Sequence, residues 1–347
     1  MRGSSGMRTD RTWTGLVLLT LASFSFGIGG PFVKPLLEAG WTPGAAVLAR
    51  TAGATLLLLV PALVALRGRW GVVRRNWRAF AVYGGFAVVG AQLCYYSAIE
   101  RLSVGVALLI EYLAPVILVV AAWVRTRRSP GAFTLAGTVV ALTGLALVVN
   151  PAGGARIDAL GVVLALGAAF GAAVYYAMSA KSDPDMPPIV LLTGSMAFAT
   201  ALLLVLGLAG VAPMRAALGP VELLGSVVPW FVPLAVVVGV STVAAYSLGI
   251  AGSSRLGARL ASFVGLSEVL FAILLAWLLL GDVPAPLQFV GGALILTGVV
   301  LVRSQKERAA DAGASVEGEA EDGSEVPAGV APASPEPPRA VPEPATR

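Results

Sequence analysis

Long apolar runs, bounded by glycine, proline or charged residues, make up most of this 347-residue chain. A transmembrane helix needs about 20 apolar residues, and ten runs approach or exceed that length. We predict an all-α integral membrane protein in which these ten runs are the transmembrane helices. They lie near residues 12–32, 44–66, 79–99, 103–124, 132–150, 158–179, 188–211, 229–250, 256–280 and 285–303. The segments between them are short and leave no room for a soluble domain.

The lysines and arginines between the runs are unevenly divided between the two ends of the predicted helices. Alternate loops, counted with the ends of the adjoining runs and the residues that flank the first and last runs, hold 17 of these residues in one set and 4 in the other. Because cytoplasmic loops are rich in Lys and Arg, we predict that both termini are cytoplasmic, including residues 1–11. The first run resembles a signal peptide, but its length and its poor cleavage site favour a retained helix.

Residues 304–347 differ in kind from the rest of the chain. They carry 4 Lys or Arg against 9 Asp or Glu, and they are rich in proline. A segment with no apolar periodicity cannot bury enough surface to fold. We therefore predict a disordered acidic and proline-rich cytoplasmic tail, with a docking or regulatory role as the alternative.

The composition excludes several kinds of chemistry. The chain is 57% hydrophobic and 12% charged, and it has no histidine and a single cysteine, Cys94. A Ser-His-Asp triad, a histidine-ligated zinc site and an intramolecular disulfide are therefore excluded. The basic residues form no long positive face, which argues against nucleic-acid binding. We expect no cofactor, no metal ion and no nucleic-acid partner, and the bilayer is the solvent of the first 303 residues.

The chain contains an internal repeat. A shift of 154 residues aligns 101–148 with 255–302, and 12 of the 48 pairs are identical; a weaker match appears at a shift of 146. The repeating unit is five spans, so we predict five-helix repeats over 12–150 and 151–303. Because five is odd, the second repeat enters the membrane from the opposite side, which is the inverted topology of many secondary transporters. The alternative is that the duplication only built a helical bundle.

Several stretches carry a resemblance to a known family. They are Phe24–Lys34, Leu48–Arg50, Ala107–Trp123 and Ser267–Asp282. Within the frame of two five-span repeats, the chain resembles the EamA-type transporters of the drug/metabolite transporter superfamily over nearly all of 12–303. In that family the ninth span often reads Glu-Pro. Here Glu268 is followed by valine, while the aligned pair in the first repeat is Ala114-Pro115, so each repeat keeps half of the motif.

Three charged residues lie inside predicted spans, where a charge costs at least about 2.5–3.5 kcal/mol. Glu111 shares a helix face with Pro115, which cannot donate a backbone hydrogen bond and so leaves the carbonyl of Glu111 free. Such a site suits an ammonium group or a proton; the alternative is a structural ion pair with Arg50. Glu268 is a candidate coupling carboxylate, with hydrogen bonding to a nearby serine as the alternative. Arg50 is a candidate anion site, with snorkelling or pairing as the alternative.

The resemblance also implies a central cavity lined by several spans. Phe24, Tyr95, Tyr112 and Tyr246 lie on those spans and are candidates to contact a solute, because aromatic rings stack and tyrosines also donate hydrogen bonds. Lys34 and Glu38 lie at the outer mouth and are candidates for gating. Small residues in the fifth and tenth spans are predicted to pack helices closely, within the protomer or across a homodimer. They are Gly137, Ala141, Gly144, Gly291 and Gly298.

These observations favour a secondary active transporter in a bacterial inner membrane, with no enzymatic activity. The pattern Leu109-Ile110-Glu111-Tyr112 followed by Pro115 is similar to that of amino-acid exporters of the superfamily, such as threonine/homoserine efflux proteins. The resemblance implies export of a small polar metabolite such as an amino acid or amine, with proton coupling as a hypothesis. The alternatives are a multidrug or nucleotide-sugar carrier, a membrane enzyme acting on lipid-linked substrates, and a non-transporting scaffold.

Overall fold

The computed structural model describes residues 4–127, 131–149, 158–179, 185–223 and 225–301. The side chains of residues 4–12, 149, 175–179 and 257–263 lie outside this description. The described residues all belong to the first of two units of the chain, Met1–Gln305. The predicted tail, 304–347, lies outside the described residues.

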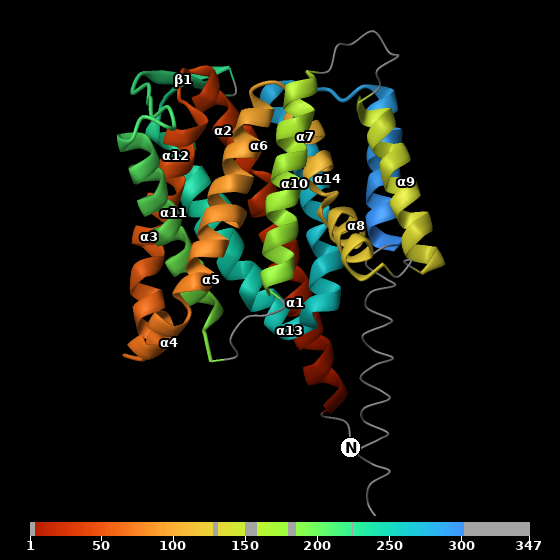
Figure 1. Ribbon diagram of the computed structural model, residues 1–347, viewed down its shortest axis with the longest axis horizontal. Coiled ribbons are helices and arrows are strands. Elements are labelled where there is room, and N and C mark those ends of the chain that lie inside the picture. Colours follow the sequence, from red (N-terminus) through yellow and green to blue (C-terminus); the bar gives the residue numbers. More distant parts are fainter. Residues whose placement is uncertain (1–3, 128–130, 150–157, 180–184, 224, 302–347) are drawn as a thin grey trace, which may run out of the picture. The chain divides into compact units, whose positions relative to one another are not determined.

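The described part of the chain is helical apart from one short hairpin (Figure 1). The first half comprises α1 (Ser4–Gly27), α2 (Gly29–Glu38), α3 (Pro43–Leu66), α4 (Trp70–Arg75), α5 (Trp77–Val82), η1 (Tyr83–Gly90), α6 (Ala91–Ile99), α7 (Val104–Glu111), α8 (Ala114–Thr126) and α9 (Ala132–Val149). The second half comprises α10 (Ala159–Ser179), α11 (Pro188–Leu208), β1 (Pro220–Leu223), β2 (Ser226–Pro229), α12 (Phe231–Val238), η2 (Gly239–Ala244), α13 (Ala245–Gly265) and α14 (Ser267–Leu280). A last apolar helix covers Pro286–Leu301.

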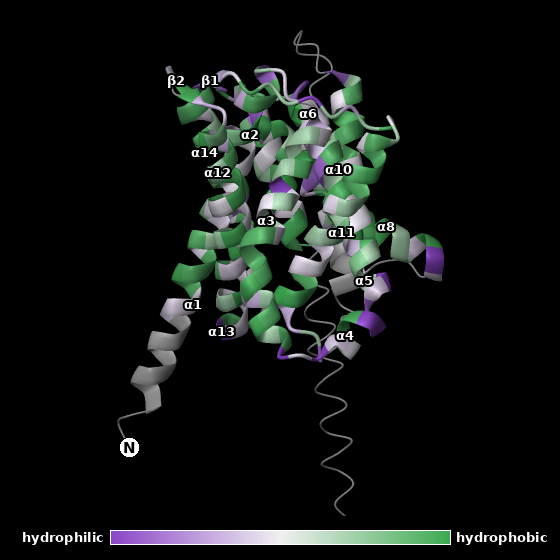
Figure 2. Ribbon diagram, turned by 90° about the vertical axis from the view of Figure 1, so that its left-hand side faces the viewer, coloured by the Kyte–Doolittle hydropathy of each residue, from purple (hydrophilic) through white to green (hydrophobic). Residues whose placement is uncertain are grey.

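Six helical segments in the described residues are long and apolar enough to cross a membrane, and four shorter apolar helices accompany them. Each of the ten predicted runs overlaps one of these segments. Hydrophobic residues extend along the helices, and hydrophilic residues gather mainly at their ends (Figure 2). The all-α class of the membrane region is therefore confirmed, while the number of ten membrane crossings stays a prediction.

The hairpin β1–β2 was not predicted. Its strands are antiparallel and pair Pro220 with Pro229 and Leu223 with Ser226. The connection is two residues long, and its second residue, Gly225, has φ +66°, a conformation that glycine adopts without strain. The segment before the hairpin is tied to the α2–α3 connection, because the indole nitrogen of Trp41 donates to a backbone carbonyl there at 2.7 Å. The hairpin thereby lies over one end of the bundle (Figure 1).

The boundary between the eighth and ninth predicted spans is wrong in position. The sequence placed it at 251–255, but α13 continues through these residues. The contacts along α1 show where the chain turns back, because they run antiparallel before residue 257 and parallel after residue 263. On the antiparallel side Gly15 meets Leu256, Leu19 meets Gly252 and Ala22 meets Gly249; on the parallel side Ser23 meets Val264 and Gly27 meets Glu268.

The two repeats pack against each other through equivalent residues. A Cβ added to Gly15 would lie 2.6 Å from Leu256 Cγ, and one added to Gly161 would lie 2.8 Å from Leu102 Cγ. Gly15 and Gly161 are one aligned pair of the repeat, and Leu102 and Leu256 are another. The first helix of each repeat therefore contacts the end of the third helix of the other.

The small residues of the fifth and tenth predicted spans also meet each other. A Cβ on Gly298 would collide with the carbonyl oxygen of Gly137, and one on Gly144 would lie 2.5 Å from that of Gly291. The two pairs run in opposite order along the chain, so α9 and the helix Pro286–Leu301 are antiparallel neighbours (Figure 1). Close helix packing by small residues within the protomer is thus confirmed.

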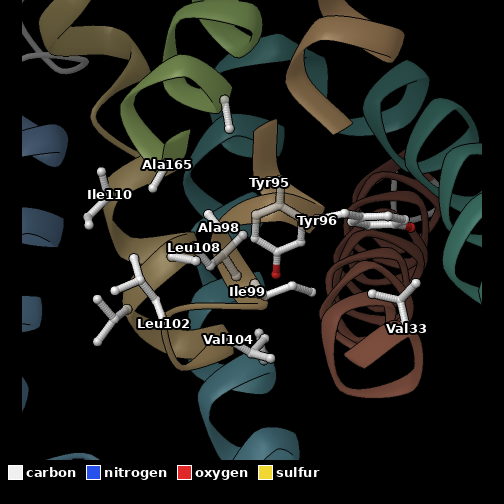
Figure 3. Close-up of a cluster of buried hydrophobic side chains, with 14 of the residues drawn as sticks. Val33, Tyr95, Tyr96, Ala98, Ile99, Leu102, Val104, Leu108, Ile110 and Ala165 are labelled. Carbon is white, nitrogen blue, oxygen red and sulfur yellow. The ribbon is translucent and has the colours of Figure 1, made fainter. Parts of the chain in front are cut away.

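The core centres on α6 and α7. Tyr96, Ile99 and Val104 are at most 1% exposed. They pack with residues of α2 and α10, such as Val33 and Ala165, in one continuous cluster (Figure 3). Because α7 is packed in this cluster as far as Ile110, the cluster positions Glu111 at the end of that helix.

Candidate functional site

The fourth predicted span is broken in the middle. Ser103 caps the start of α7 by accepting a hydrogen bond from the backbone N–H of Val106. The helix ends at Glu111, and α8 begins at Ala114 with Pro115 in its first turn. Proline has no N–H to continue the hydrogen-bond ladder, which explains the break. The structure thus has a helix break directly before Pro115.

The ninth predicted span is broken at the aligned place. α13 ends at Gly265, which aligns with Glu111, and α14 begins at Ser267. No proline lies at this break. Instead Gly265 combines high backbone freedom with no side chain to pack, which weakens a helix. Glu268 follows in the first turn of α14, where a carboxylate is favoured by the unpaired N–H groups of the helix start.

The two breaks face one small cavity of about 110 Å³. Its walls are Leu108, Glu111, Tyr112, Ala114, Pro115, Ala172 and Glu268. Four residues singled out from the sequence thus come together from the two repeats: Glu111, Tyr112, Pro115 and Glu268. That they bind or couple a solute stays a prediction.

The two carboxylates of this cavity have different surroundings. Glu268 Oε2 accepts a hydrogen bond from the hydroxyl of Tyr112 at 2.8 Å. The predicted serine partner Ser267 instead donates to the carbonyl of Val264, and the side chain of Ser262 lies outside the described residues. Among the described residues, none forms a hydrogen bond or ion pair with the Glu111 carboxylate. The alternative of an ion pair between Glu111 and Arg50 is therefore not what the structure shows.

Arg50 lies in a separate polar cluster. Its side chain is buried, at 7% exposure, so it does not snorkel to the membrane surface. Nε donates to Thr242 at 2.8 Å, and Nη1 donates to Gln92 at 2.7 Å and to the Tyr96 hydroxyl at 3.0 Å. Within the described residues no carboxylate lies in ion-pair distance, and no hydrogen bond reaches Nη2. A buried guanidinium without a counter-ion is suited to an anionic group of a ligand.

The other aromatic candidates lie outside the cavity that the two glutamates share. Phe24 packs edge-on against Phe271 with ring centroids 5.4 Å apart, and Tyr246 packs edge-on against Phe26 at 4.8 Å. Tyr95 is 7% exposed and lies in the α6 core cluster (Figure 3). A solute role for Phe24, Tyr95 and Tyr246 stays a prediction.

Sequence reasoning missed two π-helical segments at aligned positions. η1 covers Tyr83–Gly90 in the third predicted span and η2 covers Gly239–Ala244 in the eighth. In η2 the hydroxyl of Thr242 donates to the carbonyl of Val237 and accepts from Arg50. π-Helical turns are rare and often lie at functional sites. Polar Ser241 and Thr242 inside an otherwise apolar run were the available signal.

Ion pairs join segments of the two repeats. Lys34, just after the first predicted span, donates to Asp282, just after the ninth, at 2.9 Å. Arg101 donates to Asp158, just before α10, at 3.0 Å. The backbone N–H of Gly161 and the guanidinium of Arg101 lower the pKa of Asp158 below its ordinary value. A gating role for Lys34 stays a prediction, as does one for Glu38.

A second and larger cavity is almost entirely apolar. Its volume is about 380 Å³, and it lies between α7, α14 and the helix Pro286–Leu301. Leu109, Ile273 and Trp277 are among its lining residues. In neither cavity do the described residues include a group of three His, Cys, Asp or Glu side chains that could hold a metal ion.

Comparison with known proteins identifies the family. The model of the EamA-like transporter family matches residues 13–150 and 159–304. A solved structure described only as the crystal structure of a protein is 19% identical, with a TM-score of 0.51, and the match covers 87% of this chain and 98% of the other. That likeness concerns the fold alone. A search of curated proteins found no match.

The family match covers both predicted repeats, and its first boundary at residue 150 coincides with that of the first predicted repeat. The resemblance inferred from the motifs is thus confirmed. The chain belongs to the EamA-like transporter family and is a membrane transporter of the drug/metabolite transporter superfamily.

Proposed function

We propose that this chain is a secondary active transporter that exports a small polar metabolite, an amino acid or an amine, by alternating access with proton coupling. The observation that supports it best is the shared cavity of Glu111 and Glu268. Each carboxylate lies beside the break of an aligned helix, one from each repeat. Broken helices at a repeat interface are where such transporters bind their solutes and coupling ions.

The two carboxylates are proposed to have different tasks. Glu111, which has no hydrogen-bond partner among the described residues, binds the ammonium group of the solute. Glu268, whose oxygen is held by Tyr112, exchanges the proton. Arg50 provides the positive charge for a carboxylate when the solute is an amino acid, since within the described residues no hydrogen bond reaches its Nη2 and no carboxylate lies in ion-pair distance.

Ten membrane crossings in an inverted arrangement are part of this proposal. The equivalent contacts Gly15–Leu256 and Gly161–Leu102 support it, because each joins the first helix of one repeat to the end of the third helix of the other. The arginine-rich loops are proposed to face the cytoplasm of a bacterium, together with both termini. Single cysteines introduced into a Cys94→Ala background test this: residues 67–78 should be protected from an impermeant thiol reagent in right-side-out vesicles, and residues 215–220 should be labelled.

Transport itself is tested with the purified chain in sealed liposomes. A labelled amino acid or amine should accumulate when a pH gradient is imposed, and it should be recovered chemically unchanged. Glu111→Gln should strongly reduce accumulation, whereas Glu222→Gln in the exposed hairpin strand β1 is the matched control and should not. A chemically altered solute would favour a membrane enzyme, and full gradient-driven transport by folded Glu111→Gln would refute the role of Glu111.

A further inference from the structure

The hydroxyl of Tyr112 lies between two acceptors. It is 2.8 Å from Glu268 Oε2 and 3.1 Å from the backbone carbonyl oxygen of Gly265. A phenol has one hydrogen to donate, although its oxygen can also accept. Whether the hydroxyl of Tyr112 donates to the carbonyl of Gly265 therefore depends on whether Glu268 carries a proton.

The carbonyl of Gly265 depends on this hydroxyl. The last carbonyls of a helix have no partner within the helix and need other donors. At the end of α13, the hydroxyls of Ser23 and Ser267 donate to the carbonyl of Val264. The backbone N–H of Val269 donates to the carbonyl of Leu266, with 3.3 Å between nitrogen and oxygen. Among the described residues, Tyr112 is the donor that serves Gly265.

The two protonation states of Glu268 distribute the hydrogens differently. When Glu268 is neutral, its hydroxyl donates to Tyr112, and Tyr112 donates in turn to Gly265, so that each contact has its own hydrogen. When Glu268 is ionised, the carboxylate is the stronger acceptor and takes the hydrogen of Tyr112. The carbonyl of Gly265 then loses the donor that it has among the described residues, which costs stability at the break because a partly buried polar group loses its hydrogen bond.

We propose that Tyr112 is a positioning residue that transmits the protonation of Glu268 to the break between α13 and α14. Tyr112 itself lies in the break between α7 and α8. One side chain thus joins the aligned breaks of the two repeats, so that a proton on Glu268 holds them together and its release loosens them. The inference rests on the proposed function in that it assigns the conformational consequence of the coupling proton.

Other charged or titratable groups face Glu268 from the helices around it, and they affect the pH at which it takes up a proton. Glu111 shares its cavity. Arg50 on α3 and Tyr95 on α6 interact with it electrostatically. On α2, Lys34 is held by Asp282, which follows the C-terminal end of α14. The described side chains of α1 place Ser23 and Phe24 beside this part of the bundle, and neither is charged.

The test is hydrogen–deuterium exchange of the full chain in lipid nanodiscs, read at the backbone amides of residues 266–270. After correction for the intrinsic pH dependence with the amides of α11, wild-type exchange at the break should rise about two- to tenfold from acidic to alkaline pH, as expected for one lost hydrogen bond. Tyr112→Phe should exchange fast at both pH values. Glu268→Gln, an amide that still donates to Tyr112, should stay protected at both.

Tyr83→Phe is the matched control, because Tyr83 lies in η1 away from the cavity, and it should keep the wild-type pH response. If Tyr112→Phe keeps this response, or if the wild type shows none, the inference is overturned. If Tyr112→Phe does not fold, Glu268→Gln takes its place, and a break in Glu268→Gln that still responds to pH overturns the inference. Transport assays separate the two proposals: a pH-dependent break in a chain that moves no solute contradicts the proposed function and leaves the role of Tyr112 standing.

Discussion

The two broken helices occupy aligned positions in the two repeats, yet they differ in how they are broken. In the first repeat Pro115 removes the backbone donor, and the carboxylate of Glu111 precedes the break. In the second repeat the break lies at Gly265, with no proline, and the carboxylate of Glu268 follows it. The repeat supplied two breaks at aligned positions, and the two glutamates that line their shared cavity have different surroundings.

The difference has a physical consequence. A proline break is fixed by covalent chemistry, because no donor can be restored at that position. The break at Gly265 is instead held by side chains of other helices, Ser23 and Tyr112, so its stability depends on groups that can move or change protonation. The second repeat therefore contains the adjustable break, and the first contains the fixed one.

The largest expected effect separates the two acids. Glu111→Gln should reduce both solute exchange and gradient-driven uptake by about 10- to 100-fold, because a charge-assisted hydrogen bond to the solute is worth about 1.5–3 kcal/mol. Glu268→Gln should keep exchange and lose the response to the pH gradient. Both rates are measured in liposomes with equal amounts of folded protein. Identical defects in the two variants would contradict the division of tasks.

The next effect concerns Arg50, whose three hydrogen-bonding partners among the described residues come from two helical segments, α6 and η2. Arg50→Gln should lower the free energy of unfolding by about 2–4 kcal/mol, because it leaves Thr242 and Tyr96 without a charged partner inside the bundle. Thermal unfolding in detergent measures the change. Arg69→Gln, at the exposed start of α4, is the control and should have little effect. An unchanged melting temperature in Arg50→Gln would show that the cluster does not stabilise the fold.

A smaller effect is expected where the two repeats remain equivalent. Gly298→Ala places a methyl group against the carbonyl oxygen of Gly137, and the backbone there cannot yield as a side chain would. Such overpacking costs about 1–3 kcal/mol. Gly71→Ala in α4 is the matched helical control, because nothing lies within 4 Å of its added Cβ. If both substitutions leave thermal stability equal, the close approach of α9 and the last helix is not required.

The sequence predicted those parts of the molecule that depend on composition and repetition. Each apolar run overlaps a helix, since burial in lipid is a property of about 20 residues together. The break at Pro115 was predictable because a missing donor is local. The break between α13 and α14 was not, because Gly265 resembles many other glycines in this chain and the donors that serve its end come from Ser23 and Tyr112, far away in sequence.

In the candidate site, too, local features could be predicted from the sequence and contacts between distant residues could not. Glu111, Arg50 and Glu268 were found because a charge in an apolar run is costly wherever it lies. Their partners were not found, because hydrogen bonding depends on which helices become neighbours. Gln92 and Thr242 gave no sign in the sequence that they would hold Arg50. The hydroxyl of Tyr112 was expected near a solute, and the structure places it on Glu268.

The smallest expected effect concerns the aligned arginines Arg101 and Arg255, which lie beside the two equivalent contacts between the repeats. Arg101 is bound to Asp158, whereas its counterpart Arg255 donates to the carbonyl of Ala251 in its own helix. The N–H of Gly161 and the guanidinium of Arg101 lower the pKa of Asp158 in the folded chain. The stabilisation is therefore present above the ordinary aspartate pKa, which is about 3.8, and is lost as the pH falls through the lower value of the folded state. Asp158→Asn should remove this acid-sensitive part of thermal stability, and Arg255→Gln should leave it intact. If Asp158→Asn kept the same acid dependence, the difference between the two contacts would have no energetic meaning.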